Sequence, residues 1–309
     1  MFSILFPGQG SQNIGMAKEL VKDFSYVKDY FLEANDLLKK DLTKIILEGP
    51  KELLDQTENT QPAIFLVSYS FFKVIENETQ FKTQNAKYFA GHSLGEYSAL
   101  CCSNAITFKQ TIQLLKFRGK AMQNAVPSGE GGMIAILGKT IDEIKNILDE
   151  NKDKYKCYIA NDNTNGQAAI SGKIKDLNML GDELNKKNIK FVNLAVSAPF
   201  HCPLMKNATD QMRDLINNTE FKDPTIDIVS NVTAKPLNKS KDIKNFLIEQ
   251  IEKPVRWRES IYYMINLGIT NFIEMGPGKV LSGLIKRIDR NVKLNQVNNL
   301  SDINNLTND

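Results

Sequence analysis

Histidine, cysteine and tryptophan are scarce in this chain of 309 residues, which contains two histidines, four cysteines and one tryptophan. The cysteines have no C-x-x-C spacing and are too few for the dense disulfide framework of small secreted domains. They are Cys101, Cys102, Cys157 and Cys202. We therefore expect reduced thiols in a cytoplasmic protein. Because the sequence offers no cluster of metal-ligating residues, we also expect no metal and no bound cofactor.

The chain also lacks a long hydrophobic run and a strong excess of either charge. Its longest apolar run, 62–75, is interrupted by Ser68, Ser70 and Lys73, which favours a buried helix over a membrane span. The apolar residues 2–6 are too few for a signal peptide and have no basic residues before them. The net charge is +3, with Lys and Arg dispersed along the chain. We therefore expect neither a membrane nor a nucleic acid as a partner.

Short apolar segments alternate with longer helical patterns, which predicts an α/β fold. Strands are expected at 2–6, 88–90, 226–230 and 271–274, and helices at 16–38, 62–75, 96–102 and 280–288. After about Gln296 the chain is rich in Asn and Asp and poor in apolar residues, so we expect a frayed tail there.

The glycine-rich stretch 127–132 predicts a domain boundary. The elements expected between it and residue 197 follow the order β-α-β-β-α-β, which is the signature of a ferredoxin-like domain. They are strands at 133–137, 157–161, 167–171 and 190–194, and helices at 141–149 and 174–187. We therefore predict an α/β-hydrolase-like large domain formed by residues 1–127 and 198–309, with a ferredoxin-like small domain, 128–197, inserted in it.

Residues 91–95, Gly-His-Ser-Leu-Gly, fit the G-x-S-x-G pattern of a nucleophile elbow and stand between an expected strand and an expected helix. Ser93 is therefore the candidate nucleophile, although Gly and Ser also gather in ordinary turns. The elbow would direct the N–H of Leu94 to the point where an oxyanion forms. A second N–H must come from a loop after a neighbouring strand. Residues 7–10 offer either that loop or an ordinary glycine-rich turn.

A serine nucleophile needs a base, and the chain has only two histidines, His92 and His201. The side chain of His92 should diverge from that of its neighbour Ser93, so we expect it to pack or orient the elbow. An isolated histidine such as His201 is often structural. Because no other imidazole is present, His201 is nevertheless the best candidate for the base.

Five segments in this order resemble the malonyl-CoA:acyl carrier protein transacylase family. They are FPGQGSQ (6–12), GHSLGEYSAL (91–100), FRGKAMQ (117–123), SAPFHCPLM (197–205) and GPGKVLSGL (276–284). The resemblance extends to about residue 297 and includes the inserted domain.

The resemblance implies a role for each residue that matches these motifs. Ser93 would become malonylated, with His201 as its general base and later its general acid. The backbone N–H groups of Gln9 and Leu94 would form the oxyanion hole. The main-chain carbonyl that holds the histidine in this family would belong to Gln250.

Substrate recognition is implied in the same way. Arg118 would bind the malonyl carboxylate, and Met122 and Asn163 would lie near the acyl group. A planar guanidinium binds a carboxylate through two parallel hydrogen bonds, which favours malonyl over acetyl groups. On its own, however, Arg118 would be an ordinary surface residue of a helix. Phe200, beside the expected base, is bulky enough to crowd a branched methylmalonyl group.

The implied activity is transfer of a malonyl group from coenzyme A to the phosphopantetheine thiol of an acyl carrier protein, through a malonyl-serine intermediate, in fatty-acid biosynthesis. Three alternatives use the same fold. They are a serine thioesterase or hydrolase, an acyltransferase that serves a polyketide or polyunsaturated-lipid pathway in trans, and a non-catalytic module that binds carrier proteins. We expect a monomer. Lys186, Lys187 and Lys190 suit an acidic carrier, or they are simply a solvated helix end.

Overall fold

The computed structural model describes residues 1–196 and 198–308 and contains two β-sheets. The larger sheet has the strand order β10-β9-β1-β2-β7-β8, and its pairs are parallel except β7 with β8. Its strands are β1 (Phe2–Phe6), β2 (Tyr88–Gly91), β7 (Ile228–Val229), β8 (Pro236–Leu237), β9 (Asn271–Met275) and β10 (Lys293–Val297).

Helices cover both faces of the larger sheet, as continuous apolar strands require. Along β1, Ile4 and Phe6 join a hydrophobic cluster with α5, whereas Leu5 points to the other face and joins a cluster with α12 and α13. The helices outside the smaller sheet are α1 (Lys18–Asp23), α2 (Ser25–Leu38), α3 (Leu42–Glu48), α4 (Lys51–Leu54), α5 (Thr57–Glu78), α6 (Gly95–Cys102), α7 (Phe108–Gln123), α10 (Lys206–Asn218), α11 (Ser240–Gln250), α12 (Trp257–Asn266), α13 (Val280–Ile288) and α14 (Leu300–Asn308).

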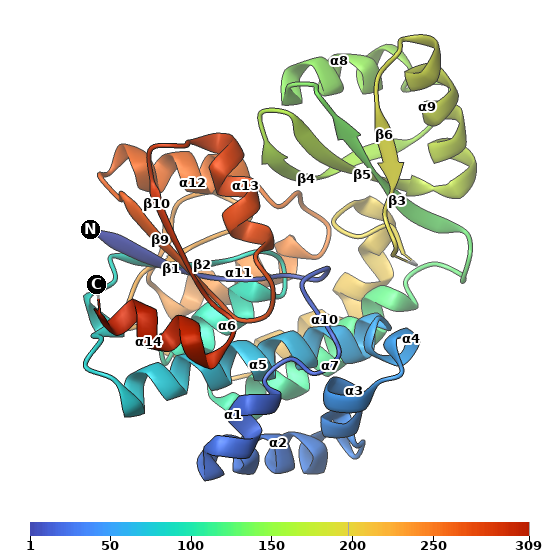
Figure 1. Ribbon diagram of the computed structural model, residues 1–309. Coiled ribbons are helices and arrows are strands. Elements are labelled where there is room, and N and C mark those ends of the chain that lie inside the picture. Colours follow the sequence, from blue (N-terminus) through green and yellow to red (C-terminus); the bar gives the residue numbers. More distant parts are fainter. Residues whose placement is uncertain (197, 309) are drawn as a thin grey trace.

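The smaller sheet stands to one side of the larger one (Figure 1). It is antiparallel, with the order β4-β5-β3-β6. Its elements are β3 (Gly131–Leu137), α8 (Ile141–Glu150), β4 (Cys157–Thr164), β5 (Gln167–Lys173), α9 (Ile174–Lys186) and β6 (Phe191–Asn193), and they enclose a hydrophobic cluster of their own. This β-α-β-β-α-β order confirms the predicted ferredoxin-like unit. All of its strands lie within the segment 128–197, although the domain boundaries themselves stay a prediction.

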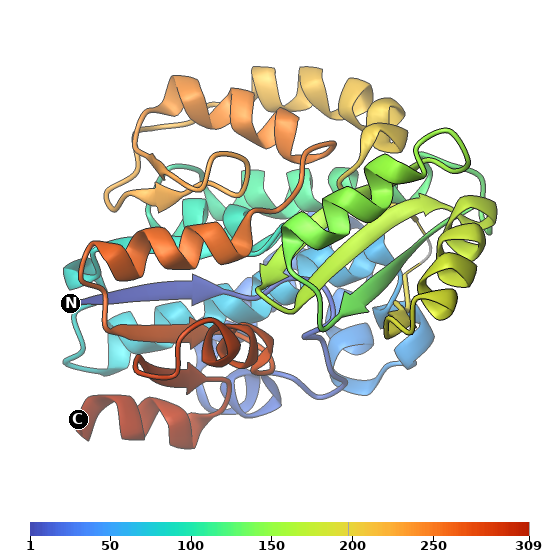
Figure 2. The same cartoon turned by 90° about the horizontal axis from the view of Figure 1, so that it is seen from above.

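Strand β4 ties the smaller sheet to the start of α12. The Val255 N–H donates to Ala160 O and the Asp162 N–H donates to Val255 O, each at 2.9 Å. Arg258 also binds the Asp162 carboxylate with two nitrogens, at 2.8 and 2.9 Å. The carboxyl end of β1 points toward the smaller sheet (Figure 2). These contacts therefore fix the smaller sheet beside the loops at that end of the larger sheet.

Three expectations about the helices were wrong. The pattern 16–38 is two helices, α1 and α2, because Phe24 between them is extended. Helix α5 begins at Thr57 and contains Pro62 rather than starting there. The segment expected to be a frayed tail instead contains the end of β10 and then α14, on which Ile303 and Leu306 are buried one turn apart. Within the described residues, no helix is both long and apolar enough to cross a membrane.

Ile303→Ala tests whether α14 contributes to stability. We expect the free energy of unfolding to fall by about 2 kcal/mol or more, because the substitution empties a site in the core. The measurement is urea denaturation followed by circular dichroism. Asn305→Ala, at an exposed position of the same helix, is the control and should change stability little. Equal stability of the two variants would mean that α14 does not belong to the cooperative unit.

Candidate active site

The turn between β2 and α6 has the geometry of a nucleophile elbow. Ser93 lies at its tip with φ of 54°, a left-handed conformation that is uncommon for a residue with a side chain. A Cβ atom on Gly91 would lie 1.9 Å from the Gly95 backbone, and one on Gly95 would lie 2.2 Å from Phe6 O. Both positions therefore require glycine, as the sequence motif predicted.

The structure brings Ser93 and His201 together although they are far apart in the sequence. Ser93 Oγ lies 2.8 Å from His201 Nε2. His201 Nδ1 lies 2.7 Å from the main-chain oxygen of Gln250, which is the last residue of α11. The final carbonyls of a helix lack partners within the helix, so this oxygen is free to accept. The Nδ1 nitrogen therefore carries the proton, and Nε2 is left to accept one from the serine.

The environment keeps this imidazole neutral. Burial, and then the nearby Arg118 guanidinium, lower the pKa of His201 to about 3. The C-terminus of α11 presents its partial negative charge to the ring and would favour the imidazolium that forms during a reaction. A neutral histidine 2.8 Å from a hydroxyl is suited to act as a general base.

Arg118 on α7 is completely buried and points at the serine. Its Nη2 donates to Ser93 Oγ at 3.1 Å and to Gln250 Oε1 at 2.9 Å, and its Nη1 donates to Gln61 Oε1 at 2.8 Å. Within the part of the chain that the structure describes, no carboxylate pairs with this guanidinium. Burial lowers its pKa, but an arginine remains charged. The surface alternative for Arg118 is therefore wrong, and the site holds a cation beside the hydroxyl whose direct partners are neutral oxygens.

Two main-chain N–H groups near Ser93 have no hydrogen-bond partner among the described residues. They belong to Gln9, in the loop after β1, and to Leu94, just before α6. The loop lies against the elbow, since a Cβ atom on Gly8 would lie 2.6 Å from His92 O. Gln9 and Leu94 line one cavity with Ser93, so both residues that the motifs suggested for an oxyanion hole lie at the same site.

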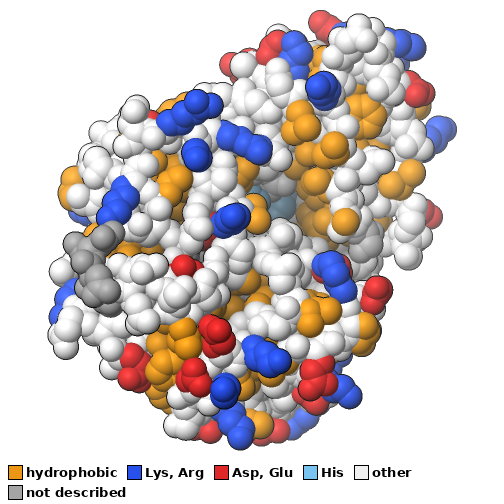
Figure 3. All heavy atoms as spheres, viewed as in Figure 1, with side chains coloured by type: hydrophobic (Ala, Val, Ile, Leu, Met, Phe, Trp, Pro, Cys, Tyr) orange, Lys and Arg blue, Asp and Glu red, His pale blue; other side chains and the backbone are white. Residues whose placement is uncertain are grey.

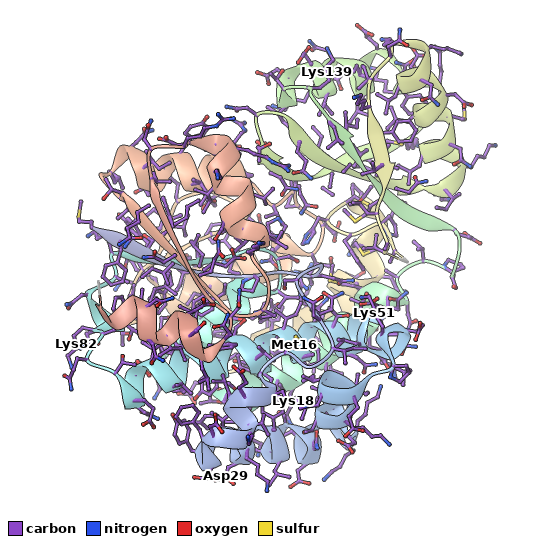
Figure 4. All side chains as sticks on the ribbon, viewed as in Figure 1. Met16, Lys18, Asp29, Lys51, Lys82 and Lys139 are labelled. Atoms are coloured by element: carbon purple, nitrogen blue, oxygen red, sulfur yellow. The ribbon has the colours of Figure 1, made fainter. Side chains whose placement is uncertain are left out.

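These groups line a cleft of about 440 Å³ between the larger and the smaller sheet. Histidine atoms are visible at its bottom (Figure 3). Met122 and Phe200 line the cleft, as expected for residues near an acyl group. Asn163 instead contacts His92, with its Oδ1 atom 3.0 Å from Nε2, and Asn161 of the same strand lines the cleft. Lys51, also a lining residue, lies where the large domain faces the smaller sheet (Figure 4).

Sequence reasoning missed three buried residues that surround these groups. Gln61 binds Arg118. Asn231 accepts from the Ser93 N–H at 2.8 Å and donates to Gly91 O at 2.7 Å, so it spans the elbow. Glu96, with no exposed surface, accepts hydrogen bonds through Oε2. Only Glu96 could have been found from the sequence, because it is the one charged residue in the otherwise uncharged helix α6. Gln61 and Asn231 stand in segments without a motif.

Comparison with known proteins agrees with this geometry. The model of a family described as "Acyl transferase domain" matches residues 4–300. A malonyl CoA-acyl carrier protein transacylase of Bacillus subtilis (strain 168) is 43% identical over 296 residues, which are 94% of this chain and 91% of that protein. The crystal structure of an acyl-carrier-protein-S-malonyltransferase from Bartonella henselae has a TM-score of 0.95 at 37% identity, covering 99% of this chain and 98% of that one.

A second solved structure is informative about partners. It is a malonyl-transacylase in complex with its type II PKS acyl-carrier protein, and that chain has a TM-score of 0.95 to this one at 37% identity. The alignment covers 99% of each chain.

The carboxyl group of Glu96 titrates abnormally. Burial raises its pKa from 4.5 to about 7, although hydrogen bonds from Asn231 and Gln250 and the Arg118 charge act in the opposite direction. The folded protein therefore binds a proton more tightly at this site than the unfolded chain does. Such a group stabilises the fold most below its unfolded pKa of 4.5, and this stabilisation is lost as the pH rises toward about 7.

Glu96→Gln should abolish this dependence, because an amide does not titrate. We expect the stability of the variant relative to the unsubstituted protein to rise by roughly 3 kcal/mol between about pH 4.5 and about pH 8. The measurement is urea denaturation of both proteins across that range, so that other titrating groups cancel. Parallel stability curves would show that the pKa of Glu96 is not raised.

Proposed function

The chain belongs to the acyl transferase family, and we propose that it is a malonyl-CoA:acyl carrier protein transacylase, which moves a malonyl group from coenzyme A to the phosphopantetheine thiol of an acyl carrier protein. One observation carries the proposal. A serine hydroxyl, a neutral imidazole and a buried guanidinium meet at one oxygen atom, Ser93 Oγ, at 2.8 and 3.1 Å.

The first half of the reaction loads the serine. His201 Nε2 accepts the Ser93 proton while Oγ attacks the thioester carbonyl. The negative charge on the carbonyl oxygen is stabilised by the N–H groups of Gln9 and Leu94. His201 then gives its proton to the sulfur atom as the bond to coenzyme A breaks, which leaves malonyl-Ser93.

Arg118 supplies the preference for malonyl. The free carboxylate of a malonyl group is only one methylene away from the reacting carbonyl, so it lies close to a guanidinium that contacts Ser93 Oγ. A hydrogen-bonded ion pair contributes roughly 1.5–3 kcal/mol, and each 1.4 kcal/mol is about tenfold in affinity. An acetyl group has no carboxylate and forgoes this interaction.

The second half of the reaction reverses the first with another thiol. The phosphopantetheine thiol of the carrier protein enters where coenzyme A left, and His201 removes its proton as the sulfur attacks malonyl-Ser93. His201 then returns this proton to Ser93 Oγ as the ester bond breaks, which leaves malonyl on the carrier thiol and the serine free. Microscopic reversibility requires the same base and the same oxyanion donors. The cycle is therefore of the ping-pong type.

The pathway is fatty-acid biosynthesis in this proposal. A polyketide pathway is the second candidate, because one similar structure is a malonyl-transacylase bound to a type II PKS acyl-carrier protein. The carrier protein that accepts malonyl fastest distinguishes the two.

We further propose a cytoplasmic monomer in which coenzyme A takes part only as a substrate. All the steps above use side chains and main-chain groups of this chain. The unpaired state of all four cysteines is compatible with a reducing compartment.

Ser93→Ala should form no covalent adduct with malonyl-CoA, because the attacking oxygen is gone. Intact-protein mass spectrometry measures the adduct, and a carrier protein added afterwards should remove it from the unsubstituted enzyme. Ser98→Ala is the control, because it alters a buried serine of α6 whose hydroxyl has no hydrogen-bond partner within the residues that the structure describes. An adduct on Ser93→Ala would remove Ser93 as the nucleophile. Release of free malonate without transfer would favour a hydrolase.

Arg118→Ala should lose selectivity rather than all reactivity. We expect the ratio of malonyl to acetyl acylation rates to fall by roughly 10- to 100-fold, the factor for one charged hydrogen-bonded pair. Rapid quenching and mass spectrometry give both rates. Lys120→Ala removes an exposed cation from the same helix and should keep the ratio. An unchanged ratio in Arg118→Ala would exclude this residue from substrate binding.

A further inference from the structure

Gln250 contacts each of the three groups that meet at the cleft. Its main-chain oxygen accepts from His201, and its side-chain Oε1 accepts from Arg118 at 2.9 Å. Its Nε2 lies 2.8 Å from Glu96 Oε2, 3.1 Å from Ser93 O and 3.2 Å from Asn231 Oδ1. Because the residue has no exposed surface, water does not compete for these contacts. The direction of one amide therefore affects the whole site.

The two ends of an amide have nearly the same shape, so its partners decide its direction. A guanidinium only donates hydrogen bonds and must meet the oxygen of Gln250. An ionised carboxylate only accepts and must meet the nitrogen. A reversed amide would place N–H groups against Arg118 and an oxygen against Glu96, and both contacts would be repulsive. Arg118 and Glu96 therefore select the same orientation from opposite ends.

Apart from Gln250, the Asn231 N–H and the charge of Arg118, no group among the described residues explains the burial of Glu96. It does not line the cleft, and among the described residues it forms no ion pair with a Lys, Arg or His side chain. Its Oε1 atom is buried and has no hydrogen-bond partner in the described parts of the chain, whereas Oε2 accepts from both Gln250 Nε2 and the Asn231 N–H. Burying a carboxylate is costly unless it is paired and hydrogen-bonded, so these two hydrogen bonds offset part of the cost of placing Glu96 here.

We propose that Glu96 is a positioning residue of the active site, which fixes the Gln250 amide so that its oxygen holds the Arg118 guanidinium beside Ser93. The proposal rests on the transacylase function and deepens it, because the orientation of Arg118 determines the selectivity for a carboxylate-bearing acyl group. Glu96 would act only through Gln250 in this respect and would not touch the substrate.

Glu96 also supports the elbow, and the experiment must separate this effect. Glu96 accepts a hydrogen bond from the main-chain N–H of Asn231. The side chain of Asn231 in turn binds the Ser93 N–H and Gly91 O. Loosening Asn231 would slow attack on malonyl and acetyl thioesters alike. Loss of the Gln250 orientation would slow the malonyl reaction more than the acetyl reaction, because only a malonyl group uses the Arg118 guanidinium. The ratio of the two acylation rates therefore isolates the proposed role.

A double-mutant cycle tests the proposal. Gln250→Leu removes the amide but keeps the main-chain carbonyl that holds His201, and we expect it to lower the malonyl:acetyl ratio about tenfold. Glu96→Leu should lower the ratio by a similar factor. The double variant should match Gln250→Leu alone, because no amide remains to be oriented. Effects that multiply in the double variant would show that Glu96 acts independently of Gln250 and would overturn the proposal.

Glu96→Gln covers the possibility that Glu96→Leu does not fold. At about pH 8 it replaces a charged acceptor with a weaker neutral one, so we expect the malonyl:acetyl ratio to fall about threefold. In the Gln250→Leu background the same substitution should leave the ratio unchanged. Ser98→Ala is the matched control on the same helix and should keep the ratio. An unchanged ratio in Glu96→Gln would overturn the proposal. Failure of the unsubstituted enzyme to form a malonyl adduct would instead overturn the transacylase function.

Discussion

The site depends on a positive charge that is buried before any substrate arrives. Arg118 has no exposed surface, and neutral oxygens from Gln61, Gln250 and Ser93 satisfy three of its hydrogen bonds. Moving a cation out of water is expensive when no anion is in contact with it. The surrounding fold meets that cost with oriented amide dipoles, and the cavity is thereby prepared for an anionic acyl group. The arrangement is a form of electrostatic preorganisation.

The two sheets have different tasks around this charge. The larger sheet supplies the rigid parts, because the loop after β1 and the elbow after β2 come from neighbouring parallel strands. The smaller sheet forms the opposite side of the cleft and is held by β4 against the start of α12. Strand ends of a parallel sheet are where such sites are generally built. The inserted unit converts an open sheet edge into a cleft that bounds the substrate on two sides.

The residues that carry chemistry were more predictable than the network that orients them. A glycine pattern specifies the elbow, and the scarcity of histidine points to His201 once the side chain of His92 is expected to diverge from Ser93. The burial of Arg118 could be predicted only from its motif, because an isolated arginine in a helical pattern is normally exposed. The orientation of the Gln250 side chain, and its contacts with Glu96 and Asn231, could not be predicted, because hydrogen bonds between distant segments leave no local pattern. The ordered α14 was missed because two apolar residues one turn apart are a weak signal in an Asn-rich stretch.

Gln250 holds His201 through its main-chain oxygen and Arg118 through its side-chain amide, and substitutions can change only the second of these contacts. The hydrogen bond to His201 uses a backbone oxygen, which every amino acid possesses, so no amino-acid substitution at this position removes the acceptor. The side-chain amide, by contrast, is open to replacement. A lineage could therefore alter acyl-group preference through residue 250 while the support of its base stays intact, which makes this position a safe route for divergence within the fold.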